Sequence, residues 1–137
     1  MDIQPTENRW KQRFENFNKA LVNLSLATTT HQAQPADVLV RIAVIKTFEM
    51  TFELAWKTLK DYLNFNGVEV KLPREVLKQA FANGLLPDGQ VWINMLDDRN
   101  LMAHTYDDER ALLAIHHICS DYLPAIKALQ LYLEEKV

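Results

Sequence analysis

The chain has 137 residues, of which 48% are hydrophobic and 24% are charged, and its formal net charge is −3. This composition predicts one soluble domain with a substantial core, and the mild acidity argues against a general nucleic-acid coat protein, which would be basic. Three glycines and five prolines favour long helices over a turn-rich β fold. Cys119 is the sole cysteine, which excludes an internal disulfide and a cysteine-held metal site.

Neither a secretion signal nor a membrane span is expected. Residues 1–14 are polar and mixed in charge, unlike the apolar core of a signal peptide. The longest apolar run, residues 38–45, is interrupted by Arg41 and is too short to cross a bilayer. We therefore expect a cytoplasmic protein without membrane contact, in which residues 1–137 form a single domain.

The first predicted helix runs from near residue 6 to near residue 28, with Thr6 as a reasonable N-cap. Its apolar residues follow a spacing of four, three, four and three, which is typical of one helical stripe. Bulky side chains in such a stripe predict the core of a helical bundle. The stripe consists of Trp10, Phe14, Phe17, Leu21 and Leu24.

The second predicted helix, residues 36–65, is closed by Asn66 and Gly67 and is apolar on two sides. A helix of this kind is usually covered on both sides, by other helices or by a second subunit, and we therefore expect a homodimer. The main stripe consists of Val38, Ile42, Ile45, Phe48, Phe52, Trp56, Leu59 and Leu63. The second strip consists of Val40, Val44, Leu54, Tyr62 and Phe65.

Three further helices are predicted in the second half of the chain. Pro73 opens a short helix over residues 74–82, and a longer helix begins at residues 88–90. The last helix begins near Asp107 and contains Pro124, which should kink or split it. Its expected stripe consists of Leu112, Ile115, Ile118 or alternatively Cys119, Tyr122, Ile126, Leu129 and Leu133.

Two charged residues of opposite sign fall inside apolar stripes. Glu49 lies in the main stripe of the second helix, and Arg99 lies in the stripe of the helix that begins near residue 88. A buried carboxylate needs a partner, so one interpretation is a Glu49–Arg99 pair in a functional cleft. The alternative places Glu49 at the solvent edge of the core and Arg99 at the surface beside Asp97 and Asp98.

The segment 99–106 carries the best candidates for chemistry. Arg99 can hold a phosphate, His104 can move a proton near neutral pH, and Tyr106 offers a hydroxyl for modification. In a continuous helix Arg99 and His104 would lie roughly 140° apart. A helix end before His104, or a cleft shared by two subunits, is needed to bring them together. Asn100, four residues before His104, is placed to orient the imidazole.

An arginine and a histidine around a phosphodiester suit a ribonuclease that needs no metal or cofactor. His104 would act as general base on the 2′-hydroxyl or as acid on the leaving oxygen, and Arg99 would stabilise charge on phosphorus. No Walker loop, G-x-S-x-G or H-E-x-x-H motif competes with this hypothesis. The adjacent His116 and His117 point in different directions on a helix and do not form a metal pair. An ordinary helix end with a capping histidine is the alternative.

The sequence resembles the HEPN superfamily, because residues 99–106 match its R-x-x-x-x-H-x-Y motif. It is more closely similar to the small, HepT-like HEPN proteins named nucleotidyltransferase substrate-binding proteins. The segments that carry this resemblance are residues 48–57, 73–76 and 92–106. The likeness covers nearly the whole chain and preserves order and spacing.

The resemblance implies an all-α fold, an up-and-down four-helix bundle with an extra short helix. It also implies a homodimer with a cleft between its subunits, where RNA or a nucleotide would bind. Members of the family are typically encoded beside a minimal (MNT) nucleotidyltransferase, and the pair behaves as a toxin–antitoxin module. In that module the HEPN protein is a metal-independent RNA endonuclease.

The resemblance also assigns roles to individual residues. Arg99 and His104 fall on the catalytic arginine and histidine of the motif, and Tyr106 falls on the tyrosine that the partner enzyme silences with AMP. Glu49 is our first choice for the polar residue that family members carry on the second helix near the site, and Glu53 is the second choice. Two other functions stay open: a non-catalytic subunit that binds a nucleotide or substrate for the transferase, and a plain dimerisation module.

Overall fold

The computed structural model describes residues 5–102 and 107–137, and the regular structure in these ranges is helical, without strands. This confirms the predicted all-α class. The elements are α1 (Pro5–Ala33), α2 (Val38–Phe65), α3 (Pro73–Ala82), α4 (Gly89–Met102), α5 (Asp108–His117), the π-helical η1 (Ile118–Tyr122) and α6 (Leu123–Glu134).

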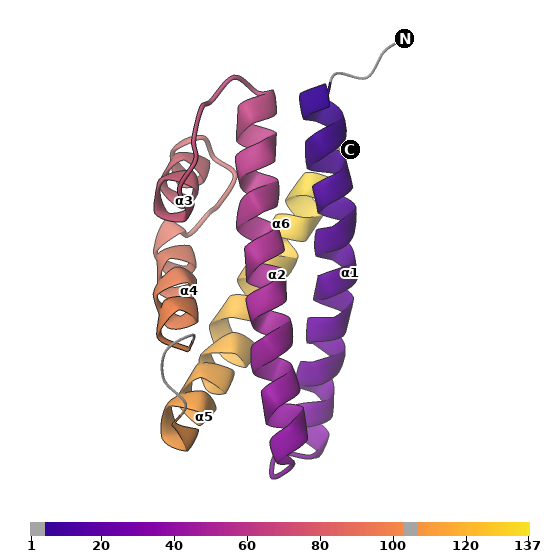
Figure 1. The fold of residues 1–137 in the computed structure, drawn as a ribbon, viewed down its shortest axis with the longest axis vertical. Coiled ribbons are helices and arrows are strands. Elements are labelled where there is room, and N and C mark those ends of the chain that lie inside the picture. The colour runs from indigo at the N-terminus through magenta and orange to yellow at the C-terminus, as the bar shows by residue number, and fades with distance from the viewer. Residues whose placement is uncertain (1–4, 103–106) are drawn as a thin grey trace.

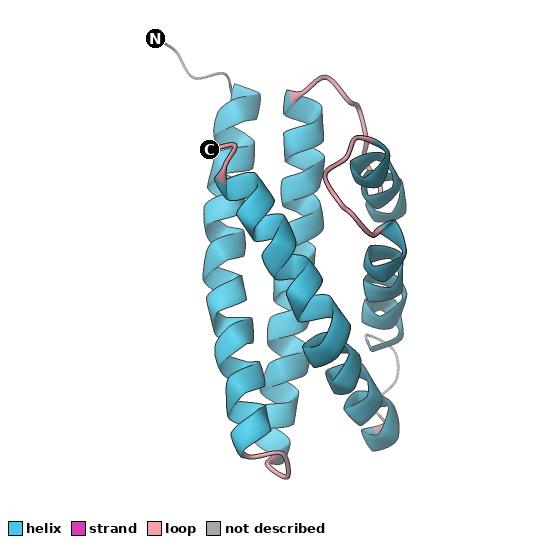
Figure 2. Cartoon of the chain, turned by 180° about the vertical axis from the view of Figure 1, so that it is seen from behind, coloured by secondary structure: helices cyan, strands magenta, loops and turns pink. Residues whose placement is uncertain are grey.

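The two longest helices, α1 and α2, form an antiparallel pair that runs the length of the molecule (Figure 1). Helices α3 and α4 follow one another along the side of α2, and α5, η1 and α6 make one rod that crosses the pair diagonally (Figure 2). The short extra helix predicted over residues 74–82 corresponds to α3. None of the helices in the described ranges is both long and apolar enough to span a membrane.

Helix α1 extends to Ala33, five residues beyond the predicted end near Thr28. The helix accommodates the threonines at its end, whose hydroxyls hydrogen-bond to carbonyls of the preceding turn and are thereby satisfied inside the helix. Thr28 Oγ1 donates to the Ser25 carbonyl at 3.0 Å, and Thr30 Oγ1 donates to the Leu26 carbonyl at 2.8 Å. The predicted stripe of α1 is confirmed, since all five of its side chains are buried.

Helix α2 begins and ends with clear caps. The Asp37 side chain accepts from the backbone N–H groups of Leu39 and Val40, and Gly67 takes a φ of 86° just after the C-cap Asn66. The main stripe is buried from Phe48 onwards, but its first three members are not, and of these only Ile45 is half-buried. Val38 is 61% exposed and Ile42 is 42% exposed, so the N-terminal third of α2 presents apolar side chains to solvent.

The rod formed by α5, η1 and α6 changes its helical winding immediately before Pro124. The C-cap N–H of Leu123 bonds to the Ile118 carbonyl, a five-residue step that is typical of a π-helix. Proline lacks the N–H that would continue the ladder, and it sits in the first turn of α6 where this loss costs little. The predicted stripe is buried from Ile115 onwards, whereas Leu112 is 42% exposed and does not belong to the core.

Candidate functional site

Helix α4 brings Arg99 to the surface of the bundle at its last turn. Trp92, Met95 and Leu96 are buried and fix the helix against the core. Arg99 continues the same side of the helix, but its side chain is only partly enclosed, at 28% exposure. The apolar residues before Arg99 therefore pack α4 against the core, and the guanidinium lies at the border between this buried surface and solvent.

The guanidinium of Arg99 pairs with the carboxylate of Glu53 on α2. The Nη2 atom donates to Glu53 Oε2, and the Nη1 atom donates to Asn100 Oδ1 at 3.0 Å. The Glu53 side chain is 35% exposed, so both charged groups keep some contact with solvent. This pair holds the guanidinium in one place while leaving an edge of it open.

Glu53 is held as an anion by several donors. Besides Arg99, Trp56 Nε1 donates to Oε2 at 3.1 Å, and Lys57 Nζ lies 3.2 Å from Oε1. Partial burial on its own raises the pKa of Glu53, but the hydrogen bonds from Arg99, Trp56 and Lys57 together outweigh burial and lower the pKa. Glu53 is therefore ionised at neutral pH and acts as the fixed counter-ion of Arg99.

The Glu49–Arg99 interpretation is wrong, because Glu53 occupies the place that it gave to Glu49. The alternative for Glu49 is confirmed, since its side chain is 29% exposed at the edge of the core. Glu49 lies one turn earlier on α2, where its closest ionic neighbour is Lys46 Nζ at 4.0 Å. Residues four apart share nearly the same face of a helix, so periodicity could not separate the two glutamates. The choice depends on the level at which α4 crosses α2, which is a tertiary property. The idea of a charge pair between these two helices was correct.

The two aspartates before Arg99 do not pair with it either. Asp97 Oδ1 lies 2.7 Å from Arg74 Nη2 on α3, and Asp98 Oδ2 accepts a hydrogen bond from the Tyr122 hydroxyl on η1. Burial raises the pKa of Tyr122 far above its ordinary value, and the hydrogen bond to Asp98 raises it further. The phenol is therefore a permanent donor that ties α4 to the π-helical segment.

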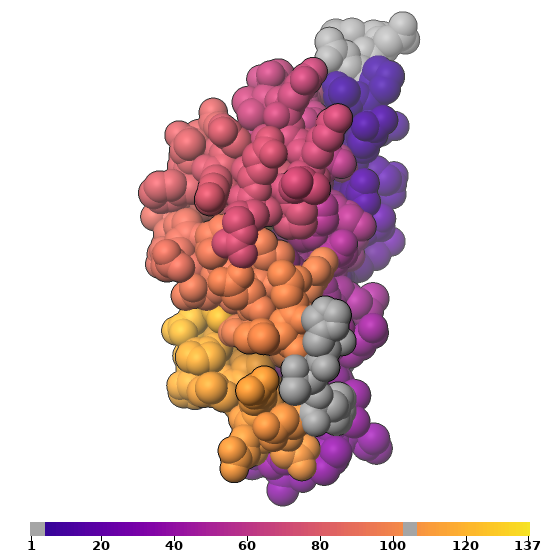
Figure 3. Space-filling model, turned by 60° about the vertical axis from the view of Figure 1, so that its left-hand side comes forward, coloured from indigo at the N-terminus to yellow at the C-terminus, as the bar shows by residue number. Residues whose placement is uncertain are grey.

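Two predicted site residues, His104 and Tyr106, lie outside the described residues. Asn100 is exposed and accepts from Arg99 Nη1, and its role in orienting His104 stays a prediction. The described residues on either side of the gap, Met102 and Asp107, both line one cavity. Figure 3 shows the face on which α4 lies beside α5 and the N-terminal half of α2.

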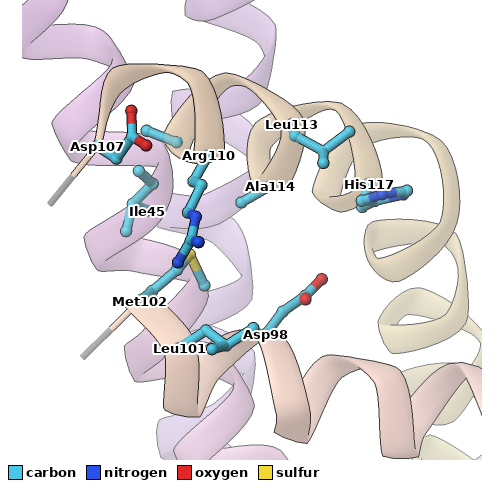
Figure 4. Close-up of a pocket in the computed structure, with 10 residues that line it drawn as sticks. Ile45, Asp98, Leu101, Met102, Asp107, Arg110, Leu113, Ala114 and His117 are labelled. Atoms are coloured by element: carbon cyan, nitrogen blue, oxygen red, sulfur yellow. The ribbon is translucent and has the colours of Figure 1, made fainter. Parts of the chain in front are cut away.

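The cavity next to this gap has a volume of about 320 Å³ and combines apolar walls with charged groups. Asp98 approaches from α4, while Arg110 and His117 approach from α5 (Figure 4). Sequence reasoning did not find this set, because the residues come from two helices and no spacing links them. In the described ranges no group of three or more His, Cys, Asp or Glu residues could hold a metal ion. The apolar walls consist of Ile45, Leu101, Met102, Leu113 and Ala114.

Comparison with known proteins identifies the family. The sequence profile described as "Nucleotidyltransferase substrate binding protein like" matches residues 12–135. The chain belongs to this family. The resemblance stated from the sequence is thereby confirmed over nearly the whole chain.

One relative of this family member is the "Probable ribonuclease HepT" of Haemophilus influenzae, which is 33% identical over 92 residues. The match covers 64% of this chain and 62% of that relative, so the chain spans less than two thirds of the relative's length. A crystal structure from Thermus thermophilus is 32% identical with a TM-score of 0.73, covering 82% of this chain and 94% of the other.

The fold is also that of a HEPN toxin. The tri-AMPylated Shewanella oneidensis HEPN toxin, solved in complex with MNT antitoxin, gives a TM-score of 0.75. The likeness covers 97% of this chain and 99% of the toxin, at 11% sequence identity. At this identity the comparison establishes the fold, and it confirms the predicted HEPN-like arrangement of helices.

Proposed function

We propose that this protein is the RNA endonuclease toxin of a HEPN/MNT toxin–antitoxin module and that it cleaves RNA without a metal ion. Its family membership and its similarity to a probable HepT ribonuclease support this proposal. The HEPN toxin with the same fold was solved in complex with an MNT antitoxin, which supports a nucleotidyltransferase partner. Arg99 and His104 are the proposed catalytic residues.

The observation that supports the proposal most directly is the fixed position and partial exposure of the Arg99 guanidinium. Its guanidinium is fixed by Glu53 and Asn100, partly open to solvent, and five residues before His104. A positioned guanidinium of this kind suits a phosphate, because its planar fork can bind two oxygens at once. Fixed charge that needs no reorganisation during the reaction is usually a major part of catalysis.

The proposed reaction is an internal transfer within the RNA strand. His104 removes the proton of the 2′-hydroxyl, and the 2′-oxygen attacks the adjacent phosphorus. The bond from phosphorus to the 5′-oxygen breaks, and that oxygen takes up a proton. Arg99 stabilises the extra negative charge on the phosphoryl oxygens in the transition state. The products are a 2′,3′-cyclic phosphate and a 5′-hydroxyl end.

A homodimer is part of the proposal, with the Arg99 and His104 residues of both subunits facing one cleft. Apolar side chains stand exposed on the part of the surface that surrounds α4 and the start of α2, which supports a covered face. These side chains are Val38 and Ile42 on α2, Leu101 on α4, and Leu112 and Leu113 on α5. In a shared cleft, Arg99 of one subunit and His104 of the other could act on the same phosphate.

The decisive experiment is expression of the full chain in a bacterium, followed by analysis of the RNA. We expect growth arrest by the wild type, with RNA fragments that end in cyclic phosphate, and no arrest by Arg99→Ala or His104→Ala. Arg9→Ala and His116→Ala change an exposed arginine and an exposed histidine elsewhere and should behave as wild type. The purified protein should cleave RNA in the presence of EDTA.

A non-catalytic, nucleotide-binding subunit is the second candidate, favoured by the family description and by the cavity that Asp98 and Arg110 line. It predicts that the wild type causes no growth arrest and leaves RNA intact. It also predicts a stable complex with the nucleotidyltransferase and measurable binding of free nucleotide. These results together would replace the ribonuclease proposal.

A further inference from the structure

The cavity between the end of α4 and helix α5 combines an apolar interior with directed polar groups. Its volume of about 320 Å³ lies at the lower end of the range of small-molecule sites, which is roughly 300–1,000 Å³. Ile45, Met102 and Ala114 contribute apolar surface from three different helices. Asp98 and Arg110 extend into the space between α4 and α5 (Figure 4). A ligand that suits this cavity has an apolar body with polar edges.

Asp98 presents hydrogen-bond acceptors at a fixed position. Its Oδ2 atom is held by the Tyr122 hydroxyl, which is buried and remains protonated. The second carboxylate oxygen, Oδ1, has no hydrogen-bond partner among the described residues, and each carboxylate oxygen can accept more than one bond. Asp98 therefore selects a ligand edge that carries N–H donors.

Arg110 supplies a cation at the same cavity. No carboxylate in the described part of the chain lies within ion-pair distance of its guanidinium, which extends from α5 toward Met102 (Figure 4). The nearby Asp107 is engaged as the N-cap of α5, where its carboxylate accepts from the Glu109 backbone N–H at 3.1 Å. A phosphate group is the natural partner for an arginine in this position.

We propose that this cavity binds one guanine nucleotide unit, with the base inside and the phosphate on Arg110. Guanine presents two adjacent donors, N1–H and the N2 amino group, which a single carboxylate can accept side by side. Adenine places a ring acceptor beside its amino group, and uracil offers one N–H between two carbonyls. Neither base therefore presents two adjacent donors to the Asp98 carboxylate. The apolar walls cover the faces of the base.

This inference rests on the proposed function in one respect: if the protein cleaves RNA, the guanine nucleotide belongs to an RNA strand and lies next to the cleaved bond. A free guanine nucleotide has the same chemistry and would fit a substrate-binding subunit instead. The two sources differ in the affinity of a strand relative to a mononucleotide. A strand ligand gains contacts outside the cavity, and a free nucleotide does not.

The test is calorimetric titration of the full chain with GMP, AMP, CMP and UMP, and with the 2′-O-methylated trinucleotide UpGpU, which cannot be cleaved. We expect GMP to bind about tenfold more tightly than UMP, since hydrogen bonds to a charged group typically contribute about this much. Asp98→Asn replaces one carboxylate oxygen by an NH2 donor and removes the negative charge, and it should abolish this preference. Arg110→Gln should weaken the binding of GMP by about tenfold. It should leave the binding of guanosine, which lacks phosphate, nearly unchanged.

Matched variants separate occupation of the cavity from general damage to the fold. Ala111→Leu fills this cavity and should abolish GMP binding. Ala43→Leu adds the same atoms to a separate groove between α1 and α2 and should leave binding unchanged. Tyr122→Phe keeps the Asp98 carboxylate and should retain the preference for GMP over UMP, with weaker binding overall.

The outcomes distinguish this site from the proposed function. Equal affinity for all four mononucleotides, or GMP binding that survives Ala111→Leu, overturns the guanine site whether or not the protein cleaves RNA. Preferential GMP binding without cleavage of any RNA supports the site and overturns the ribonuclease. UpGpU binding at least tenfold tighter than GMP identifies the RNA strand as the source, and equal binding identifies the free nucleotide.

Discussion

The Tyr122 hydroxyl on η1 donates a hydrogen bond to Asp98 on α4, one residue before the arginine that pairs with Glu53 on α2. Helix α4 is thus tied on one side to the π-helical segment and on the other side to α2. The π-helical step before Pro124 sets the position of Tyr122 along the rod. These connections fix the end of α4 beside the segment that carries the proposed chemistry.

Removing the Tyr122 hydroxyl should weaken this connection. Tyr122→Phe leaves the apolar ring in place but deprives Asp98 of its donor, and we expect the free energy of unfolding to fall by about 1–2 kcal/mol. Urea denaturation measures this change. Tyr132→Phe is the matched control, because the Tyr132 hydroxyl makes no hydrogen bond within the described ranges, and it should change stability by less than about 0.5 kcal/mol. Equal effects of the two variants would contradict the role of the Tyr122–Asp98 bond.

The pairing of Glu53 with Arg99 should make stability depend on pH at the acid end. The donors around Glu53 lower its pKa in the folded protein below the ordinary value of 4.5, so the anion is stabilised by folding. This contribution is present above the unfolded pKa and is lost as the pH falls through the lower, folded pKa. The difference in unfolding free energy between wild type and Glu53→Gln should therefore be largest at pH 6–7 and should shrink below about pH 4.5.

Glu49→Gln is the control for this pH dependence, because Glu49 makes only a 4.0 Å contact with the exposed Lys46. Its effect on stability should be small and nearly the same at pH 7 and pH 3. Denaturant titrations of the three proteins at several pH values give the comparison. A larger pH dependence for Glu49→Gln than for Glu53→Gln would contradict the assignment of Glu53 as the partner of Arg99.

The geometry of Arg99 leads to a prediction for cleavage. Arg99→Lys keeps the positive charge but loses the planar fork that binds Glu53 and a phosphate at the same time. We expect the rate of RNA cleavage to fall by about 10²-fold or more, with a smaller change in the apparent affinity for RNA. Single-turnover cleavage of a labelled RNA separates the two quantities. An Arg99→Lys protein that cleaves at the wild-type rate would leave Arg99 only a structural role.

The proposed homodimer can be tested at the exposed end of α2. Ile42 is 42% exposed on the N-terminal third of this helix, within the apolar face that we assign to the second subunit. Ile42→Arg should convert the dimer to a monomer and abolish RNA cleavage, because the shared cleft would be lost. Light scattering after gel filtration measures the mass. Leu131→Arg on α6, at a position that is 66% exposed, should leave the mass and the cleavage rate unchanged.

Most of the fold could be predicted from the sequence because local patterns and tertiary packing agree. The aromatic stripe of α1, the Asn66–Gly67 stop and the Pro124 irregularity all depend on short-range geometry. The predicted end of α1 near Thr28 is five residues short of Ala33, because the Thr-rich segment that favours a loop by propensity is accommodated in the helix, with the hydroxyls of Thr28 and Thr30 bonded to helix carbonyls.

The candidate site was predictable only in part. A charge pair between α2 and α4 followed from two polar residues in apolar stripes, but the choice between Glu49 and Glu53 depends on how the helices cross. The cavity formed by Asp98, Arg110 and His117 joins residues whose spacing along the chain carries no signal. The register between two helices is set by side-chain packing over many residues, and the spacing of residues within either helix does not reveal it.

Tyr106 supplies the last prediction, which concerns control by the partner enzyme. Its hydroxyl follows His104 by two residues in the motif and is the proposed acceptor of AMP from the MNT nucleotidyltransferase. The added phosphodiester would bring a negative charge into the motif that contains Arg99 and His104, and this charge would repel the RNA backbone and compete for the guanidinium. Incubation with the partner and ATP should raise the intact mass by one or more AMP units and stop RNA cleavage. Tyr106→Phe should gain no AMP and should keep cleaving RNA in the presence of the partner and ATP. Tyr132→Phe is the control, and it should be labelled with AMP to the same extent as the wild type. Labelling of Tyr106→Phe to the wild-type level would assign the modification to another residue.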